Sequence, residues 1–334
     1  MKAPVKIAFI STVLNEENGI HSLLKNLLSQ SVKPDEIIIV DGGSTDKTLS
    51  ILNTYKEKHT CINLIEAVGS NIAEGRNIAI KHSSCDIIAV TDAGCRPESN
   101  WIDEITKPLR EDASVCAVSG KIITDSSNKF EYFSGLLSLP DHSSEKQKTL
   151  FYGRCSAFRR TLWQSTGGYP EWLYTAEDSL FALSAQQQGY KIIHNPKAII
   201  HWRPRPTLIK LAKMFYLYGR GNGRINWGDL QGTLYWLRYY SLILITLLLG
   251  LIYPIFWVAT FFIAIFLYYY IALPNLKKIR QLSTDWNREW YIPMITITRN
   301  FTSSLGFLRG YFEFKKNPIF KQKLDQYLKN NKPI

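Results

Sequence analysis

The stretch E-I-I-I-V-D-G-G-S-T-D, residues 36 to 46, decides the class of fold. Its short run of isoleucine and valine predicts a buried strand, and the polar turn that follows contains two glycines. Ser44 or Thr45 can cap a helix behind this turn. Glycines let a backbone approach a ligand closely, and the start of a helix offers free amide groups. The same turn could equally be an ordinary connection between a strand and a helix.

The alternation of strand and helix continues along the first half of the chain. Short apolar runs separated by helices of about a dozen residues predict an α/β fold, with a mixed, mostly parallel sheet and helices on both faces. In such sheets ligands bind beyond the carboxyl ends of the strands, where this sequence places polar clusters. The expected strands are residues 6–12, 36–40, 61–66, 86–90 and 115–118, and the expected helices include 19–28 and 71–82.

The pattern weakens in the middle of the chain and then resumes. We expect a loop or flap over residues 130–148 and ordered structure again over 151–160. The spacing predicts a helix over residues 176–188, which opens with Glu177 and Asp178, two acids that suit the positive end of a helix dipole. Two further short strands are expected, at residues 191–194 and 198–202.

An uncharged run of 33 residues, Ser241 to Leu273, sets the second half of the chain apart. Together with the apolar residues before this run, Pro254 separates two segments, residues 234–253 and 255–273, each about long enough to cross a bilayer. Basic residues flank both sides, which favours a hairpin of two transmembrane helices followed and preceded by cytoplasmic segments. A single long kinked helix is the alternative.

The C-terminal segment is basic. Residues 275–334 contain 12 Lys and Arg against 4 Asp and Glu, a balance that favours an anionic membrane surface. Residues 291–312 include Arg299 and Arg309, so we expect an interfacial or re-entrant helix there, with a third membrane helix as the alternative. The expected parts of the chain are therefore a catalytic domain at 1–225, a transmembrane hairpin at 226–274, and a cytoplasmic or interfacial tail at 275–334.

Composition excludes some functions. The formal net charge of +12 would suit a nucleic-acid-binding protein, but no nucleic-acid motif accompanies it, so nucleic acid is not expected as a partner. The five cysteines lack the spacing of a metal site and are expected as free thiols in a reducing compartment. The apolar stretch near the N-terminus breaks at Asn15 and is too short for a secretion signal. We therefore expect a multi-pass membrane protein whose N-terminal domain lies in the cytoplasm.

Three places in the sequence can carry chemistry. Asp92 follows a buried strand, and its carboxylate can reach a cation that bridges two phosphates, or it can cap a helix starting near Pro97. Asp178 can take a proton from an attacking hydroxyl, with Glu177 beside it, although acids at this place also compensate a helix dipole. His201 ends an apolar strand and is either a metal ligand or, by default, a satisfied core histidine.

Five segments stand out by their order and spacing. They are I-S-T-V-L-N-E-E at 10–17, V-D-G-G-S-T-D at 40–46, G-S-N-I-A-E-G-R-N at 69–77, T-D-A-G-C at 91–95 and A-E-D at 176–178. Together they resemble the family 2 glycosyltransferases. The resemblance covers roughly the first 225 residues and is specific in combination. It implies a Rossmann-like GT-A fold and transfer of a sugar from a nucleotide sugar with inversion at the anomeric carbon.

The resemblance implies a role for each matching residue. Asp178 would be the catalytic base, and Glu177 would support the acceptor or the geometry of its loop. Asp92 would hold a metal ion or the ribose, and His201 would complete a site for Mn²⁺ or Mg²⁺. The other matching residues would bind the nucleotide sugar; these are Thr12, Leu14, Glu16, Asp41 and Arg76.

The sequence departs from the family pattern in two places. Gly94 stands where the D-x-D motif has its second acid, which leaves a metal ion more reliant on donor phosphate, water and His201. The Q-x-x-R-W motif is missing, and a basic run at 218–224 lies near its place. Arg220 and Arg224 in that run can stabilise the leaving diphosphate or bind lipid headgroups.

These features together predict a membrane-anchored inverting glycosyltransferase of polysaccharide biosynthesis. Its expected partners are a nucleotide-sugar donor, a lipid-linked or cell-surface glycan acceptor, and the membrane. One alternative is a polyprenyl-phosphate sugar synthase, whose acidic phosphate acceptor hardly needs a base. Another is a catalytically silent protein that binds sugar nucleotides, which the glycine at position 94 would suit.

Overall fold

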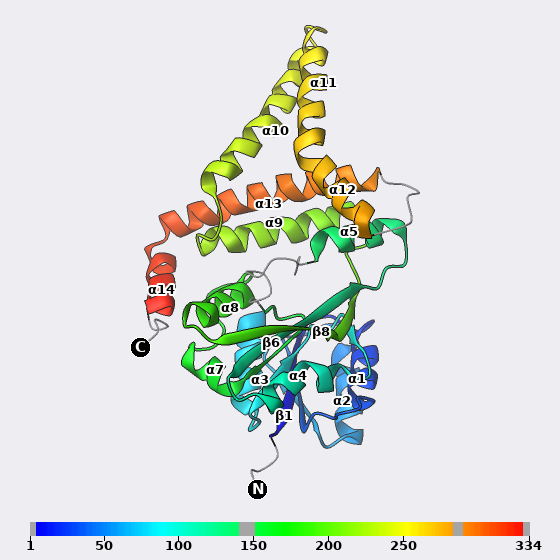
Figure 1. Cartoon of the computed structure of the whole chain (residues 1–334), viewed down its shortest axis with the longest axis vertical. Coiled ribbons are helices and arrows are strands. Elements are labelled where there is room, and N and C mark those ends of the chain that lie inside the picture. Colours follow the sequence, from blue (N-terminus) through cyan, green and yellow to red (C-terminus); the bar gives the residue numbers. More distant parts are fainter. Residues whose placement is uncertain (1–4, 140–150, 283–289, 330–334) are drawn as a thin grey trace. The chain divides into compact units, whose positions relative to one another are not determined.

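The computed structural model describes residues 5–139, 151–282 and 290–329 (Figure 1). The chain forms two compact units. The first consists of Met1–Ile123, Pro140–Arg203 and Lys323–Ile334, and the second of Thr124–Leu139 and Pro204–Gln322. The boundary at Arg203 lies before the division expected at residue 225, and the last residues of the chain join the first unit.

A single eight-stranded sheet organises the first unit, with the strand order β3-β2-β1-β4-β7-β6-β8-β5. The sheet is mixed, as expected. One half is parallel and was visible in the sequence as strands alternating with helices, whereas β7, β6, β8 and β5 extend it with antiparallel pairs. The strands are β1 (Ile7–Val13), β2 (Glu36–Asp41), β3 (Ile62–Glu66), β4 (Ile87–Val90), β5 (Cys95–Pro97), β6 (Val115–Thr124), β7 (Ser156–Arg159) and β8 (Lys191–Trp202).

The register of the parallel strands creates one polar edge. Val13 of β1 pairs with Asp41 of β2, and Ile10 of β1 pairs with Val90 of β4. The carboxyl ends of these three strands therefore lie side by side, and the segments that leave them meet there. This edge is where an open α/β sheet binds its ligands.

Helices cover both faces of the sheet. Successive side chains of a strand point to opposite faces. The ring of Phe9 lies 6.3 Å from that of Trp101, the first residue of α4, whereas Thr12 faces α3, where a Cβ on Gly75 would approach its methyl group to 2.6 Å. Helices α3 and α4 therefore lie on opposite faces. The helices of this unit are α1 (Ile20–Leu28), α2 (Thr48–Lys58), α3 (Ile72–His82), α4 (Trp101–Glu111), α7 (Arg160–Ser165), α8 (Glu177–Gln187) and the end of α14 (Pro318–Lys329).

Several local predictions are confirmed and several are wrong. The cap expected at Ser44 or Thr45 is wrong, because α2 begins at Thr48 and both residues bind the neighbouring loop instead. The helix expected to start near Pro97 begins later, at Trp101, because Pro97 ends strand β5. The two short strands expected at 191–194 and 198–202 form one continuous strand, β8. The five cysteines are free, as predicted.

Helices make up the second unit. The loop expected over residues 130–148 is wrong where the chain is described, since Lys129–Ser138 forms helix α5, and the stretch from 140 to 148 lies outside the described residues. The other helices are α9 (Leu208–Arg224), α10 (Leu230–Gly250), α11 (Phe256–Leu267) continuing through the π-helical turn η1 (Tyr268–Ala272) into α12 (Leu273–Leu282), α13 (Tyr291–Lys316) and the start of α14.

Helices α9 and α13 pack closely along each other because glycines line their contact. A Cβ added to Gly219 or Gly223 would overlap with backbone atoms of α13, and one added to Gly306 or Gly310 would overlap with backbone atoms of α9. Small residues of this kind let two helix backbones approach within van der Waals distance.

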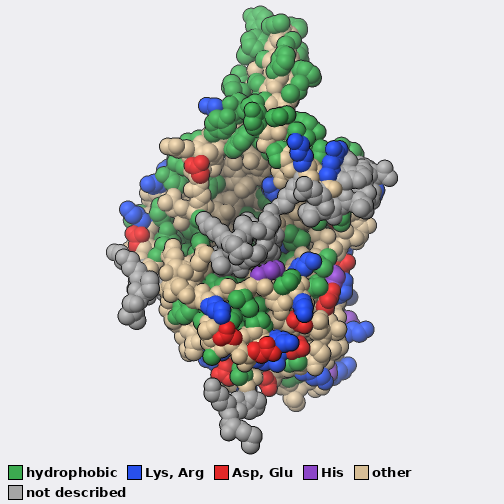
Figure 2. All heavy atoms as spheres, in the orientation of Figure 1, with side chains coloured by type: hydrophobic (Ala, Val, Ile, Leu, Met, Phe, Trp, Pro, Cys, Tyr) green, Lys and Arg blue, Asp and Glu red, His purple; other side chains and the backbone are tan. Residues whose placement is uncertain are grey.

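Helices α10 and α11 form an apolar hairpin. Among the described residues two helices are long and apolar enough to cross a membrane, Leu230–Gly250 and Phe256–Lys277. They pack against each other, and Thr260 Oγ1 donates a hydrogen bond to Thr246 Oγ1 at 2.8 Å. The alternative of one long kinked helix is therefore wrong. Figure 2 shows hydrophobic side chains covering the visible face of this hairpin.

Candidate active site

Arg76 lies at the centre of a buried charge cluster at the carboxyl edge of the sheet. Helix α3 places it there, because Asn71 caps that helix in a reciprocal capping box with Glu74. Arg76 Nη1 donates to Glu177 Oε1 at 2.9 Å, and Arg76 Nη2 donates to Asp92 Oδ1 at 3.1 Å. The guanidinium thus links the end of strand β4 to the start of helix α8.

Burial shapes the protonation of this cluster. The side chains of Arg76 and Glu177 are 4% and 7% exposed. Burial, and then the charge of the neighbouring Asp178, raise the pKa of Glu177 to about 7, although Arg76 opposes both effects. For Arg76 itself, burial lowers the pKa, but the surrounding acidic groups outweigh burial and raise it. Arg76 therefore stays charged, while Glu177 exchanges its proton near neutral pH.

A second arginine reaches Asp92 from the opposite side. Arg154 Nε lies 3.4 Å from Asp92 Oδ2, and its guanidinium carbon lies 4.3 Å from the centre of the Trp202 ring. Stacking on an aromatic ring restrains an arginine and leaves its edge available for hydrogen bonds. Asp92 therefore lies between two guanidinium groups, with 42% of its side chain exposed.

Asp178 is held beside this cluster by backbone amides. Gly153 N–H donates to Asp178 Oδ2 at 3.1 Å, and Ser179 N–H donates to Asp178 Oδ1 at 2.7 Å. A Cβ on Gly153 would overlap with the guanidinium of Arg76, so this close approach requires glycine. Ala176, directly before α8, adopts φ 68°, a left-handed conformation that costs a residue with a side chain roughly 1 kcal/mol. Such strain is common where a loop must present a functional group.

The loops after β1 and β2 are tied together by side chains. Asp41 is 2% exposed, and its Oδ1 accepts the amide hydrogens of Gly43 and Ser44, each at 2.8 Å. Ser44 Oγ donates to Asp41 and accepts a hydrogen bond from the amide of Asn15. Asn15 Oδ1 in turn accepts from the amide of Thr45 at 2.8 Å. The carboxylate of Asp41 therefore fixes the shape of its own loop.

The other predicted nucleotide-binding residues lie at the end of β1 or directly after it. Thr12 is half-buried beneath α3, and Leu14 is 56% exposed. The amide of Glu16 donates to Thr48 Oγ1, while its carboxylate lies close to Gly94, where an added Cβ would be 3.9 Å from Glu16 Oε2. A second carboxylate is thus already present beside Gly94.

His201 and Asp92, the two residues predicted to hold a metal ion, each contact other side chains. His201 Nε2 lies 3.1 Å from Glu98 Oε1, and Asp92 faces the two arginines instead. No group of three or more His, Cys, Asp or Glu within residues 5–139, 151–282 and 290–329 could hold a metal ion. The residues present do not fit a preformed cation site, so no chemical step below is assigned to a metal. A role of Asp92 and His201 in binding one stays a prediction.

Sequence reasoning missed Arg154, Gly153 and Glu98. The adjacent Gly153 and Arg154 precede β7, a strand that the sequence pattern did not resolve from its surroundings. Glu98 follows the three-residue strand β5, which is too short to show a period. A glycine next to an arginine, shortly before a short apolar run, was the available signal for the first pair.

Comparisons with known proteins relate the chain to glycosyltransferases. The model of glycosyl transferase family 2 matches residues 9–166, and that of glycosyl transferase family group 2 matches residues 136–276. An O-antigen chain rhamnosyltransferase of Salmonella typhimurium is 26% identical over 59% of this chain and 66% of its own length. Another from Salmonella anatum is 30% identical over 51% of this chain and 57% of its own length. The chain therefore spans less than two thirds of either relative.

A solved structure shows the same fold. The mannosyltransferase PcManGT of Pyrobaculum calidifontis, solved with GDP-Man and Mn²⁺, superimposes with a TM-score of 0.59. The match covers 92% of this chain and 88% of that chain, at 20% sequence identity. The fold is thus the GT-A fold that the sequence predicted.

Proposed function

Because the chain belongs to glycosyltransferase family 2, we propose that it transfers a sugar from a nucleoside diphosphate sugar to an acceptor hydroxyl, with inversion. The observation that carries this proposal is the Arg76 guanidinium, which joins Asp92 at the end of β4 to Glu177 at the start of α8. It sets Asp178 against the edge of the sheet where a nucleotide would bind. Thr12, Leu14, Glu16 and Asp41 supply the proposed walls of that nucleotide site.

The proposed reaction is a single displacement. Asp178 takes the proton of the acceptor hydroxyl, and the acceptor oxygen attacks the anomeric carbon from the face opposite the diphosphate. The bond between the anomeric carbon and the diphosphate oxygen breaks, and its electron pair leaves with the nucleoside diphosphate. Arg154 and Arg76 supply the positive charge that this leaving group requires. A single attack from the opposite face inverts the anomeric configuration.

Burial also favours this assignment of the base. Asp178 is held by two amides and lies in the field of Arg76, whereas Glu177 is bound directly by Arg76 and nearly buried. A buried carboxylate that is enclosed by an ion pair cannot reach an acceptor hydroxyl, whereas the half-buried Asp178 remains open to one. Glu177 is therefore a positioning residue and Asp178 the base.

We further propose that α10 and α11 anchor the protein in a membrane, with both ends of the hairpin in the cytoplasm. The apolar surface of the hairpin and the basic segments on both sides support this orientation. An acceptor that is itself membrane-bound, such as a lipid-linked glycan, would meet an active site held at that surface. The relatives act on O-antigen chains according to their names.

The direct test measures nucleoside diphosphate released from a panel of nucleotide sugars by the purified full chain. The panel is run with Mn²⁺, with Mg²⁺ and with EDTA, each with and without lipid extract. Release from one donor, increased by lipid extract, is the expected result. No release from any donor by folded protein would overturn the proposal and favour a silent binding protein.

One observation favours a second candidate, a polyprenyl-phosphate sugar synthase. Arg220, Arg224 and Arg309 all contact Glu313, with nearest distances of 2.7, 2.7 and 2.9 Å. Burial raises the pKa of Glu313, but the hydrogen bonds from Arg220 and Arg224 outweigh it and hold the pKa at about 2. Three guanidinium groups around one carboxylate leave a net positive charge, which suits a lipid phosphate. Two of these groups, Arg220 and Arg224, belong to α9, which precedes α10. Retention of activity without Asp178 would support this candidate, since a phosphate acceptor needs no base.

A further inference from the structure

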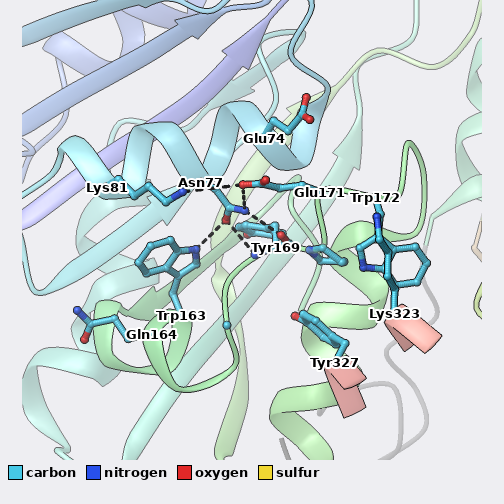
Figure 3. Close-up of a pocket in the computed structure, with 12 residues that line it drawn as sticks. Glu74, Asn77, Lys81, Trp163, Gln164, Tyr169, Glu171, Trp172, Lys323 and Tyr327 are labelled. Atoms are coloured by element: carbon cyan, nitrogen blue, oxygen red, sulfur yellow. Dashed lines mark hydrogen bonds and ion pairs between the residues drawn. The ribbon is translucent and has the colours of Figure 1, made fainter. Parts of the chain in front are cut away.

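A groove on the first unit lies outside the site described above. It encloses about 840 Å³ between helix α3, the segment 163–172 and the end of helix α14 (Figure 3). A cavity of this size falls within the range of small-ligand sites. Aromatic rings form much of its lining, from Trp163, Tyr169, Trp172 and Tyr327.

Hydrogen bonds hold the walls of the groove in place. Asn77 Oδ1 accepts from Trp163 Nε1 and from the amide of Tyr169, each at 2.9 Å, and its Nδ2 donates to Glu171 at 2.9 Å. Tyr327 Oη donates to the carbonyl of Gly168 at 2.6 Å, which attaches helix α14 to the same segment. Figure 3 shows Asn77 as the centre of this network. The polar ends of Trp163 and Tyr327 are therefore anchored, which fixes the orientation of their rings.

A smaller cavity of about 330 Å³ extends the groove along α14. The two cavities share Gln164, Gly167, Trp172, Lys323 and Tyr327, so they form one elongated surface. The extension adds hydroxyl and amide side chains, those of Ser165, Thr166 and Gln326. An elongated surface suits a chain-like ligand better than a single compact one.

The charge of the lining selects among ligands. Glu74 and Glu171 are balanced by Lys81 and Lys323 among the described lining residues. A nucleotide or a phosphorylated lipid requires an excess of positive charge, which this groove does not provide. Aromatic faces together with many hydrogen-bonding groups and no net charge match a neutral, hydroxyl-rich ligand.

The groove shares a wall with the active site. Arg76 and Asn77 are consecutive residues of α3, and Arg76 contacts the Tyr169 ring, with its guanidinium carbon 5.3 Å from the ring centre. The segment that contributes Trp172 to the groove continues to Asp178 at the start of α8. Occupation of the groove can therefore act on the segment that carries the base.

We propose that this groove binds the non-reacting part of a neutral oligosaccharide, with the rings of Trp163 and Trp172 against pyranose rings and the polar rim against their hydroxyls. The proposal rests on the proposed function, since the oligosaccharide is the chain being extended. The groove then gives the enzyme a second hold on a long acceptor, so that an acceptor of several sugars binds more tightly than a single sugar.

The test measures binding of the full chain, in detergent, to an array of neutral and anionic bacterial oligosaccharides. We expect binding to neutral oligosaccharides of three or more sugars. Trp172→Ala should weaken it about tenfold, because aromatic anchors carry most of the energy of such contacts. Lys323→Ala should weaken it severalfold, and the matched control Lys321→Ala, an exposed lysine on the same helix outside the groove, should leave it unchanged.

Three results would overturn the proposal: no binding to any neutral oligosaccharide, a preference for anionic ones, or equal binding by Lys323→Ala and Lys321→Ala. Release of nucleoside diphosphate without any acceptor is measured on the same preparations. Without an acceptor the sugar passes to water, so this release shows that each variant is folded and keeps its donor site, independently of the groove. Absence of release by the wild type from every donor, with lipid extract present, would count against the proposed function, whereas absence of oligosaccharide binding alone would count against the groove.

Discussion

At the scale of single residues, Arg76 holds two carboxylates from different elements while its own side chain is 4% exposed. Arg76→Ala leaves Glu177 buried beside Asp178 without its cation, so we expect a loss of about 3–5 kcal/mol in the free energy of unfolding. The matched control is Arg110→Ala, which removes an ion pair with Asp103 on the surface of α4 and should cost about 1 kcal/mol or less. Urea unfolding followed by tryptophan fluorescence measures both, and equal losses would contradict the central role of Arg76.

Glu177 should make stability depend on pH. Its folded pKa of about 7 lies above the ordinary value of 4.5, so the folded protein binds this proton more tightly than the unfolded chain. Its contribution to the free energy of unfolding is complete below pH 4.5. This contribution is lost as the pH rises towards 7, and the loss is about 3 kcal/mol at most. Glu177→Gln carries no titrating proton and should lack this part of the pH dependence. If the free energies of unfolding of the two proteins changed equally with pH between 5 and 8, the raised pKa of Glu177 would be contradicted.

The sequence indicated which residues belong to the proposed site, but not which side chains contact them. Asp92, Glu177 and Asp178 occupy recognisable places after a strand or at the start of a helix. The contact of His201 with Glu98 was not predicted; it arises because β5 pairs antiparallel with β8. A strand of three residues has no period to detect, so this contact could not be read from the sequence.

At the scale of elements, the contact between α9 and α13 depends on glycine. Gly223→Ala would place a methyl group against the backbone of α13, which should cost about 1–3 kcal/mol through overpacking. The control is Gly232→Ala in α10, where the added methyl group meets only the side chain of Asp229, the N-cap of that helix; the gain in helix propensity offsets part of the disturbed cap, so we expect a change within about 1 kcal/mol. Thermal unfolding in detergent compares the two variants. A larger loss from Gly232→Ala would contradict this packing.

The parallel strands and the helices between them could be predicted because each has its own period and a clear turn. The strand pairing of the antiparallel half could not, since its pairs join segments such as β4 and β7 that are far apart in the sequence. The same holds for α9 and α13, whose contact spans some eighty residues of chain. Helix α5 was predicted as a loop, because a serine and a glycine within it weaken its apolar pattern; these are Ser134 and Gly135.

At the scale of the whole molecule, the proposed topology makes a prediction about accessibility. Tyr253 lies between α10 and α11, and Lys277 follows η1 in α12. In intact cells a membrane-impermeant maleimide should label Tyr253→Cys, whereas Lys277→Cys should be labelled after the membrane is opened. The two variants serve as controls for each other. The reverse pattern would place the basic flanks outside and contradict a cytoplasmic active site.

The apolar hairpin was the clearest whole-molecule prediction, since a long uncharged run can be recognised in the sequence without knowledge of the fold. The division of the chain was harder to predict. Helix α9 belongs with the C-terminal helices, and the end of α14 belongs with the sheet through Tyr327. A hydrogen bond between residues 168 and 327 leaves no periodic trace in the sequence.

The central claim is that Asp178 is the base of a glycosyl transfer reaction. The measurement is transfer to acceptor by wild type and Asp178→Asn, together with the affinity of each for the nucleotide sugar identified in the donor panel. We predict a fall in transfer of about 10²–10⁴-fold with donor affinity unchanged, because a general base contributes on that order. Transfer at the wild-type rate by Asp178→Asn would contradict the account.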